Sequence, residues 1–402
     1  MPASPFFFFP FFYCLSRTFL KKRRREVSTM TRPSKLLCIG CMTILLSGCW
    51  DQNLLKDVRL YMAASFDLDT EGKIIDAVAS PIIKRADQGG GSAETYQIIT
   101  GIGNTPRAAR KDIDQRSSKT FDASKLRILI IGNELAKQDI YPVLDLFYRD
   151  PKSSLSAKVF ISEGIGKDIL QLNIKEQEIS EYLFELLESQ EDASLIPEEN
   201  LQSICAEMFD PGEDLILPYM SQEGGTQAKV EGIALFNERK FTGQILSGDE
   251  AMIFLLMDGT SGMKPRFTKE VTNHENNSPS DFVSFDVKKT KQQLEVKISN
   301  KEVKVNINLK LKIALTEYAR NQLYKKQEIQ FLNQKLSEIL SKDAEAAIKK
   351  LQQANSDSFG IGRRLIALHN DYWKQVDWKK EYPNISITPK VEVEIVGHGI
   401  IK

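Results

Sequence analysis

The sequence predicts an α+β fold, because three kinds of pattern follow one another along its 402 residues. Strand and helix patterns alternate over residues 58–162, which is typical of a mixed sheet covered by helices. Long strands with an apolar residue at every second position begin at residue 282. One long amphipathic helix pattern spans residues 322–355. The length exceeds that of one ordinary core and indicates two or three domains.

Composition and charge exclude several classes of protein. The chain is 42% hydrophobic and 27% charged, as expected for a folded globular protein. Residues 1–48 hold eight basic residues and one acidic residue, so the 54 of each kind leave 46 basic and 53 acidic residues in 49–402. This acidic body argues against nucleic acid as a partner, because phosphate binding requires a basic face.

Residues 30–49 have the organisation of a lipoprotein signal peptide. Arg32 and Lys35 precede an apolar run over residues 36–46, which is shorter than the ~20 residues of a membrane span but suits a signal-peptide core. Ser47, Gly48 and Cys49 then follow, in an order that resembles a bacterial lipobox. We therefore predict that residues 1–48 form a signal peptide and that Cys49 is the lipidation site. Two or three acyl chains on Cys49 would hold the chain on a bilayer.

Residues 1–29 do not fit this organisation, since a Phe-rich run is followed by the block Lys-Lys-Arg-Arg-Arg. Met30 offers a cleaner start. The hypothesis is that translation begins at Met30 and that residues 1–29 are an annotation artefact. The alternative is an additional apolar segment at a membrane interface. Peptides from residues 1–29 in the mass spectrum of the precursor would contradict the first hypothesis.

Residues 49–175 are expected to form an N-terminal mixed α/β domain. Strand patterns at 58–67 and 73–84 flank a turn and predict a hairpin. Thr105 and Pro106 have the residue types of an N-cap and a first helical position, and predict a helix to about residue 117. The continuous apolar run 126–132 predicts a strand buried on both faces. Further elements are a strand at 96–103, a helix at 134–148 and a strand at 157–162.

Residues 176–280 are expected to form a middle domain with a helical connector and a hairpin. The acidic segment 176–205 predicts two helices separated at Pro197. Strands at 230–236 and 240–246 predict the hairpin, and residues 249–256 a short helix. Cys205 lies on an amphipathic pattern and is expected to be buried. If Cys49 carries lipid, Cys205 is the only other cysteine after residue 48, so no internal disulfide is possible.

Residues 281–402 are expected to form a C-terminal domain with an antiparallel sheet and a long helix. Residues 303–313 alternate apolar side chains with Lys and Asn, which predicts one buried and one solvated face. The lysines would keep the surface soluble and deter edge pairing, or alternatively meet anionic lipid headgroups. The helix 322–355 ends at the segment 359–362, and a helix at 363–375 and a strand at 385–396 follow.

No pattern indicates catalysis, a metal site or a cofactor. The three histidines, His274, His369 and His398, have no ligand partner at metal spacing. No nucleophile elbow, phosphate-binding loop or dinucleotide fingerprint is present. Two distant carboxylates could still serve a glycosidase, so the hydrolase alternative stays open. The expectation is a protein that is not an enzyme.

Three segments carry the remaining motifs: residues 49–51, residues 126–136, and residues 355–362 with Trp373 after them. Together they resemble the Ger(x)C family, the lipoprotein C subunits of spore germinant receptors of the GerA type. Cys49-Trp50-Asp51 matches the lipidated cysteine and the Trp-Asp that follow in that family. Residues 126–136 and residues 355–362, with Trp373 after them, match in order and spacing. The family usually reads Asp-Pro-Phe-Gly where this chain has Asp357-Ser358-Phe359-Gly360.

This resemblance covers residues 49–402 and implies three mixed α/β domains with distorted sheets and packed helices. It also implies a place on the outer face of the inner spore membrane, together with two polytopic partners, the A and B subunits. A small-molecule germinant is not indicated as a ligand of this chain. Two alternatives stay open, a lipid-anchored solute-binding protein and a cell-envelope hydrolase.

Overall fold

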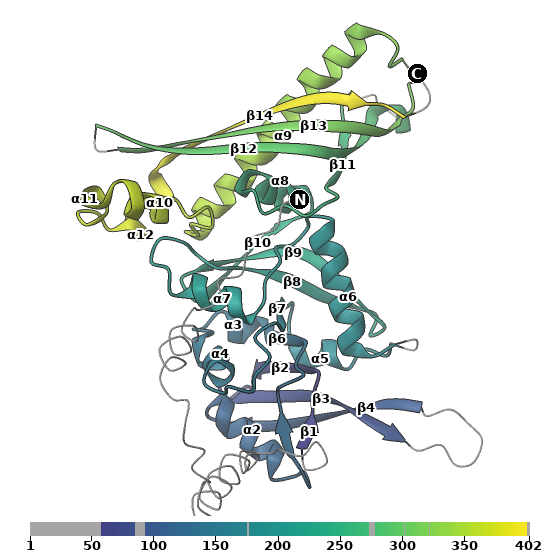
Figure 1. Ribbon diagram of the computed structural model, residues 1–402, viewed down its shortest axis with the longest axis vertical. Helices are drawn as coiled ribbons and strands as arrows, with labels where there is room; N and C mark the ends of the chain where they lie inside the picture. The colour runs from purple at the N-terminus through teal and green to yellow at the C-terminus, as the bar shows by residue number, and fades with distance from the viewer. Residues whose placement is uncertain are drawn as a thin grey trace, which may run out of the picture. The chain divides into compact units, whose positions relative to one another are not determined.

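The computed structural model describes residues 58–84, 93–174, 177–272, 278–300, 302–320 and 322–399, which belong to one compact unit (Figure 1). The predicted signal peptide, Cys49, Trp50 and Asp51 lie outside the described residues. The mixed α/β architecture with several sheets that the sequence predicted is confirmed. Within the described part of the chain, no helix has the length and apolar character needed to cross a bilayer.

A sheet of eight strands organises the first half of the unit. Its order is β10-β9-β8-β7-β6-β2-β3-β4, and β2, β6, β7 and β8 run parallel to one another in its centre. The remaining pairs are antiparallel. The bounds are β2 Ala63–Leu68, β3 Ile74–Lys84, β4 Ala93–Gly103, β6 Ile128–Gly132, β7 Lys158–Ser162, β8 Ile216–Glu223, β9 Gln227–Asn237 and β10 Lys240–Ser247. A separate parallel pair joins β1 Val58–Leu60 to β5 Thr120–Asp122.

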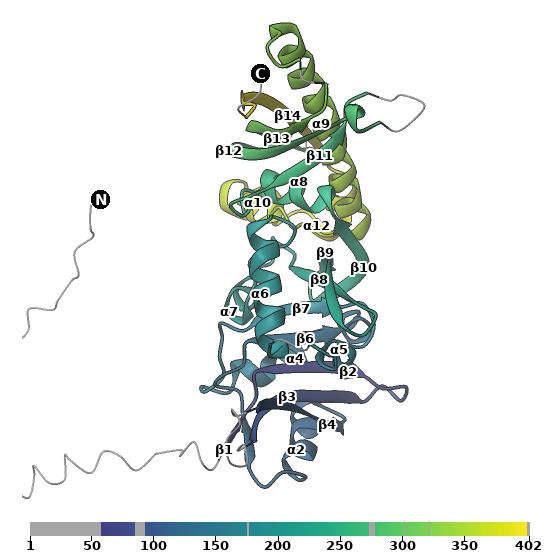
Figure 2. The same ribbon diagram turned by 90° about the vertical axis from the view of Figure 1, so that its right-hand side faces the viewer.

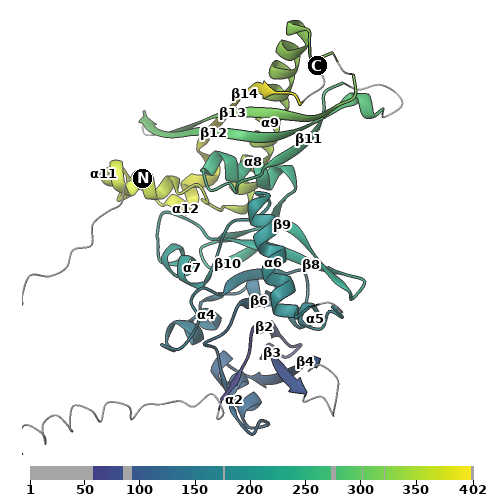
Figure 3. The same ribbon diagram turned by 45° about the vertical axis from the view of Figure 1, so that its right-hand side comes forward.

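Helices cover both faces of this sheet, which is why β6 is buried along its whole length, as predicted. One face packs against α2 Pro106–Asp114, α3 Asn133–Ala136, α4 Tyr141–Tyr148 and α7 Leu201–Met208. The other face packs against α5 Gly166–Leu170 and α6 Ile179–Asp192, and Figure 3 shows α6 lying across the strands. Each fully buried aliphatic side chain contributes about 1.5–3 kcal/mol to this packing.

The helix expected over residues 134–148 is instead two helices, α3 and α4. Pro142 lacks an N–H and cannot continue a helix from the residues before it. The Asp139 carboxylate accepts the Tyr141 N–H at 2.9 Å and starts a new helix there. The predicted start of α2 is confirmed, because Thr105 Oγ1 accepts the Ala108 N–H at 3.1 Å. Cys205 was expected to be buried and is half-buried on α7.

Backbone pairing is continuous across residue 175, where the first two domains were expected to meet. β8, β9 and β10 belong to the expected middle domain, yet β8 pairs with β7 in the first sheet. At the other end, β11 Arg266–Glu270 pairs with β12 Phe282–Ser299 in the last sheet. The division into domains at residues 175 and 280 stays a prediction.

The last sheet has the order β11-β12-β13-β14, with β13 Glu302–Tyr318 and β14 Ser386–Gly397. It was expected to be antiparallel, but β14 runs parallel to β13. The reason is the helix α9 Lys326–Ala354, which crosses one face of the sheet and returns the chain to the end where β13 began (Figure 2). The predicted alternation on β13 is confirmed, since every second side chain from Val303 to Leu315 is buried.

α8 Asp249–Asp258 joins the two sheets through a shared core. Seven consecutive residues, 251–257, are buried, because the helix contacts α9, β10, β12 and β13. A helix that is apolar on all sides needs such complete cover. The same core contains side chains of β9 and β10 from the first sheet and of β12 and β13 from the last.

Three side chains of α9 accept hydrogen bonds from backbone N–H groups at the edge of β14 that has no neighbouring strand within the described residues. The N–H groups of Val391, Val393 and Ile395 donate to Ser341 Oγ, Ser337 Oγ and Asn333 Oδ1 at 3.2, 2.9 and 2.9 Å. Four helical residues rise about 6 Å and two strand residues about 6.6 Å, so the two repeats stay in register. The helix therefore blocks this edge from pairing with another chain.

Candidate functional site

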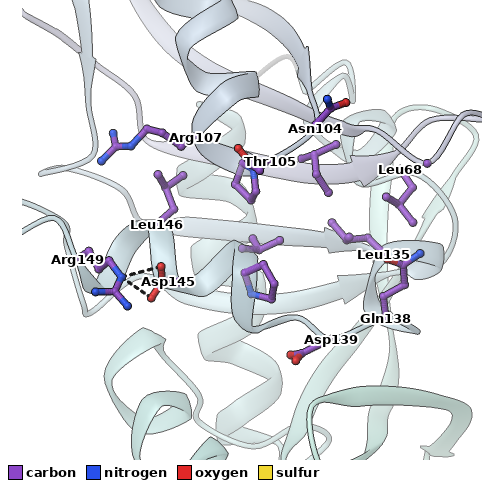
Figure 4. Close-up of a pocket in the computed structure, with 15 residues that line it drawn as sticks. Leu68, Asn104, Thr105, Arg107, Leu135, Gln138, Asp139, Asp145, Leu146 and Arg149 are labelled. Carbon is purple, nitrogen blue, oxygen red and sulfur yellow. Dashed lines mark hydrogen bonds and ion pairs between the residues drawn. The ribbon is translucent and has the colours of Figure 1, made fainter.

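A pocket of about 570 Å³ lies beside the turn between β2 and β3 and the starts of α2 and α4 (Figure 4). Its aliphatic lining comes from β2, β3, α2, α3 and α4: Leu68, Ile74, Pro106, Leu135, Pro142, Val143 and Leu146. Figure 4 shows Leu68, Leu135 and Leu146 around its centre. Leu135 and Val143 also belong to the core, so the floor of the pocket is continuous with the packed interior.

Local sequence signals shape the walls of this pocket. Asp69 accepts the N–H groups of Glu71 and Lys73, and Gly72 adopts a φ of 78°, which a glycine tolerates best. This turn brings Leu68 and Ile74 together at one wall. The cap at Thr105 fixes the start of α2 at the opposite wall.

Polar groups at the rim of the pocket are largely paired with one another. Arg149 Nε lies 2.8 Å from both carboxylate oxygens of Asp145, and the Tyr141 hydroxyl donates to the same carboxylate at 2.8 Å. These hydrogen bonds lower the pKa of Asp145. The Asp139 carboxylate forms an ion pair at 3.0 Å with Arg239, a residue that does not line the pocket.

Three exposed polar side chains of the lining, Asn104, Arg107 and Gln138, make no side-chain hydrogen bond within the described residues. Figure 4 shows Asn104 and Arg107 directed away from the aliphatic centre. A pocket with an apolar floor and a rim of this kind suits an inserted apolar side chain or a small, largely apolar solute.

The Asp-Ser-Phe-Gly segment, residues 357–360, belongs to a second cluster of polar contacts, whose role is structural. The Asp357 carboxylate accepts the N–H groups of Ile361 and Gly362 at 3.0 and 2.7 Å and the indole N–H of Trp378 at 2.8 Å. These donors come from α10 Ile361–Leu368 and from α12 Trp378–Glu381. Gly360 carries a φ of 59° at the start of α10. Burial raises the pKa of Asp357 to about 7, although the three hydrogen bonds to its carboxylate lower the pKa.

Asp214 links this cluster to the strands of the first sheet. The Asp214 carboxylate accepts the Asp357 N–H at 2.8 Å, and the Asp214 N–H donates to the Asp357 carbonyl at 3.1 Å. The exposed Arg363 forms ion pairs with Asp210, at 2.8 Å, and with Glu213. Gly212 and Gly362 approach so closely that a Cβ on either would meet the other's backbone at 3.0 Å or less. Residues 210–214 and 357–363 are thereby locked together.

Two carboxyls beside α7 have raised pKa values. Burial and the neighbouring Glu207 charge raise the pKa of Glu199 to about 9. Burial and the Glu213 charge raise the pKa of Glu207 to about 7. Perturbed carboxyls of this kind are candidates for acid–base roles. Glu199 is buried and accepts a hydrogen bond from the Ser203 hydroxyl at the start of α7, which is a structural contact.

None of these residues was identified from the sequence as part of a site. Cys49, the predicted lipidation site, lies outside the described residues. His369 and His398 lie in separate segments, and the described residues contain no cluster of side chains that could hold a metal ion. No local sequence pattern indicated that these residues line a pocket, since each of them fits an ordinary helix, strand or turn.

Comparisons with known proteins agree along the chain. Residues 51–222 match the spore germination protein N-terminal domain, and residues 231–399 match the spore germination B3/GerAC-like C-terminal domain. The chain is 24% identical over 361 residues to the spore germination protein GerQC of Bacillus cereus, covering 89% of this chain and 97% of that one. It is 24% identical over 374 residues to the putative spore germination protein YfkR of Bacillus subtilis, covering 88% and 94%.

The fold has a counterpart among solved structures. The crystal structure of the GerBC protein superposes with a TM-score of 0.55 at 17% identity, covering 83% of this chain and 97% of that one. The matched relatives are spore germination proteins, and they support a role in germination and an association with the spore. The two matched domains together span most of the sequence, and this chain belongs to the Ger(x)C family of spore germination proteins.

Proposed function

We propose that this protein is a lipid-anchored subunit of a spore nutrient germinant receptor that acts through contacts with other subunits. Membership of the family carries this proposal, together with the order of basic, apolar and small residues before Cys49. Acyl chains on Cys49 would place the body beside the outer face of the inner spore membrane. The polytopic A and B subunits would be its partners there.

The anchor is tested by replacing one thiol. Cys49→Ala removes the acyl acceptor, so the protein should leave the membrane fraction and the nutrient response should slow, because two or more acyl chains supply the stable attachment. Cys41→Ala is the matched control, since Cys41 lies in the apolar run of the same leader. If Cys49→Ala retains both its membrane fraction and its activity, the anchor has no role and the assignment fails.

The pocket beside α4 is the best candidate for a subunit contact. Its apolar floor can receive an anchoring side chain, which is the usual centre of a protein interface. Leu146→Glu places a charge in that floor, and Arg107→Glu reverses the charge at the exposed rim. Both variants should capture less of the polytopic subunits from detergent-solubilised spore membranes.

Leu155→Glu is the control for these variants, because Leu155 is also an exposed apolar residue but lies outside the pocket lining. Unchanged thermal melting would show that each variant is folded. Equal capture by the two pocket variants, the control and the wild type would remove the pocket from the interface.

A second function, solute binding, is favoured by the size of the same pocket, since sites for small molecules usually measure about 300–1,000 Å³. A ligand that binds only the native state raises the melting temperature according to its occupancy. A thermal-shift screen with amino acids and sugars tests this function. A shift that Leu146→Glu abolishes would favour solute capture over subunit contact.

A further inference from the structure

The outward face of the last sheet is rich in lysine. The face opposite α9 carries Lys289, Lys291, Gln293, Glu295, Lys297 and Ser299 of β12, Glu302, Lys304, Asn306, Asn308, Lys310 and Lys312 of β13, and Ser386, Thr388, Lys390, Glu392 and Glu394 of β14. We call these positions the lysine face. It has seven lysines and four glutamates, a positive excess within a body whose net charge is negative.

Lysines lie directly opposite one another across two of these strands. The register pairs Lys289 with Lys312, Lys291 with Lys310, and Lys297 with Lys304. Like charges at opposed positions destabilise an antiparallel pair. Protection of a sheet edge does not account for the lysines of β13, because β13 has strands on both sides, whereas the lysines of β12 lie beyond Asp286, where β11 no longer pairs with β12.

Neighbouring carboxylates neutralise only part of this charge. Glu392 lies 2.7 Å from Lys310 and 2.8 Å from Lys390, and these hydrogen bonds lower its pKa to about 2. Glu394 pairs with Lys312, and Glu295 with Lys297. Within the described residues, Lys289, Lys291 and Lys304 form no ion pair, and all three are exposed.

The residue types of the face indicate which anionic partner it fits. It contains no arginine and no aromatic residue, the types that usually anchor a protein interface. Flexible lysines act as point charges and need no matched geometry. From Lys304 to Lys312 the face is about 26 Å long, and its three strands are about 10 Å wide. A broad array of this kind suits the headgroups of an anionic bilayer.

We propose that the lysine face rests on the surface of an anionic bilayer. This inference depends on the proposed lipid anchor, because the eight residues between Cys49 and Val58 keep Val58 within about 30 Å of the attachment point and so hold the body near the bilayer. At such an effective concentration a weak electrostatic contact suffices. β1, where the tether enters, and the lysine face lie at opposite ends of the described unit (Figure 1). Two contacts so far apart would lay the body along the membrane.

The test measures how fast an amine reagent labels individual lysines of the full-length, acylated protein. The protein is reconstituted into vesicles of phosphatidylcholine alone and into vesicles that also contain about 30% phosphatidylglycerol. In the anionic vesicles, Lys289, Lys291 and Lys304 should be labelled several-fold more slowly. The protection should disappear at about 0.5 M NaCl, because salt screens exposed charges. The exposed Lys326, Lys342 and Lys349 of α9, on the opposite side of the sheet, should be labelled equally in both vesicles.

Matched triple variants identify the residues responsible, with the labelling of Lys297 as the reporter. Replacing Lys289, Lys291 and Lys304 by Gln should weaken the contact roughly a hundredfold, since each lysine near an anionic surface contributes about a factor of five. Protection of Lys297 should then be lost. Replacing Lys326, Lys342 and Lys349 of α9 by Gln removes the same charge on the opposite side of the sheet and should leave that protection intact.

Each of the other results overturns the inference. Equal labelling of the lysine face in both vesicles, with the protein attached, rules out the bilayer contact but leaves the lipid anchor standing. Protection that occurs in native membranes and not in protein-free vesicles assigns the face to an acidic protein instead. Failure of the acylated protein to stay on either vesicle removes the anchor and this inference together.

Discussion

Removing the carboxylate of Asp357 is expected to cost about 3–5 kcal/mol of the free energy of unfolding. In Asp357→Ala, three buried donors lose their acceptor: the N–H groups of Ile361 and Gly362 and the indole N–H of Trp378. Each buried donor left unsatisfied costs about 1–3 kcal/mol. Water can enter the space left by the carboxylate and accept some of these N–H groups, so we expect a loss in the lower half of the summed range of about 3–9 kcal/mol.

Urea denaturation followed by circular dichroism and tryptophan fluorescence measures this loss. The midpoint should fall and the slope should stay unchanged, which indicates a change in stability and not in the extent of unfolding. Asp371→Ala is the control, because Asp371 is exposed on α11 Asn370–Trp373, and its effect should stay within about 0.5 kcal/mol. If the two variants unfold at the same urea concentration, Asp357 does not hold α10 and α12 in place.

Three further predictions follow from the same contacts. Ser358→Pro should change stability by no more than about 1 kcal/mol in thermal melts. Proline is favoured at the second position of the turn closed by the Gly360 N–H and the Asp357 carbonyl, and this gain offsets the loss of the buried hydrogen bond between the Ser358 and Ser356 hydroxyls; a loss above about 2 kcal/mol would contradict this account. Ser337→Ala should lower the free energy of unfolding by about 1 kcal/mol and speed hydrogen exchange at the Val393 amide, because it removes the acceptor of that N–H. Ser299→Ala, at the exposed end of the hairpin, should change neither quantity. An unchanged exchange rate in Ser337→Ala would show that α9 does not protect the β14 edge. Stability should fall as the pH rises from about 5 to 9, because the pKa values of Glu199, Glu207 and Asp357 are raised to about 9, 7 and 7, and the native state keeps protons that the unfolded chain has released. Glu199→Gln should flatten this dependence above pH 7, and a urea midpoint that rises with pH would refute the reasoning.

Several elements could be predicted because their signals are local. The alternation on β13 follows from one buried and one solvated face, and the start of α2 follows from Thr105 and Pro106. The long helix α9 follows from its three- and four-residue apolar spacing. The lipidation of Cys49 is also a local inference, since it depends on twenty consecutive residues and needs no fold.

Other elements depend on contacts that the sequence does not display. β8 includes Pro218 and lacks a clean alternation, and only its pairing with β7 and β9 makes it a strand. The direction of β14 is set by the path of α9, and no residue of β14 itself encodes it. Alternation predicts a strand but not its partner or its orientation.

The amino-acid sequence by itself determined the kinds of element and the family, and it predicts the leader, because short-range periodicity and ordered motifs suffice for these. The tertiary structure alone decided the sites. Asp214 and Asp357 are 143 residues apart yet share two hydrogen bonds. The pocket draws its lining from five separate elements, and the lysine face needs the register of three strands. Long-range packing brings these residues together, and no local pattern records which distant segments will meet.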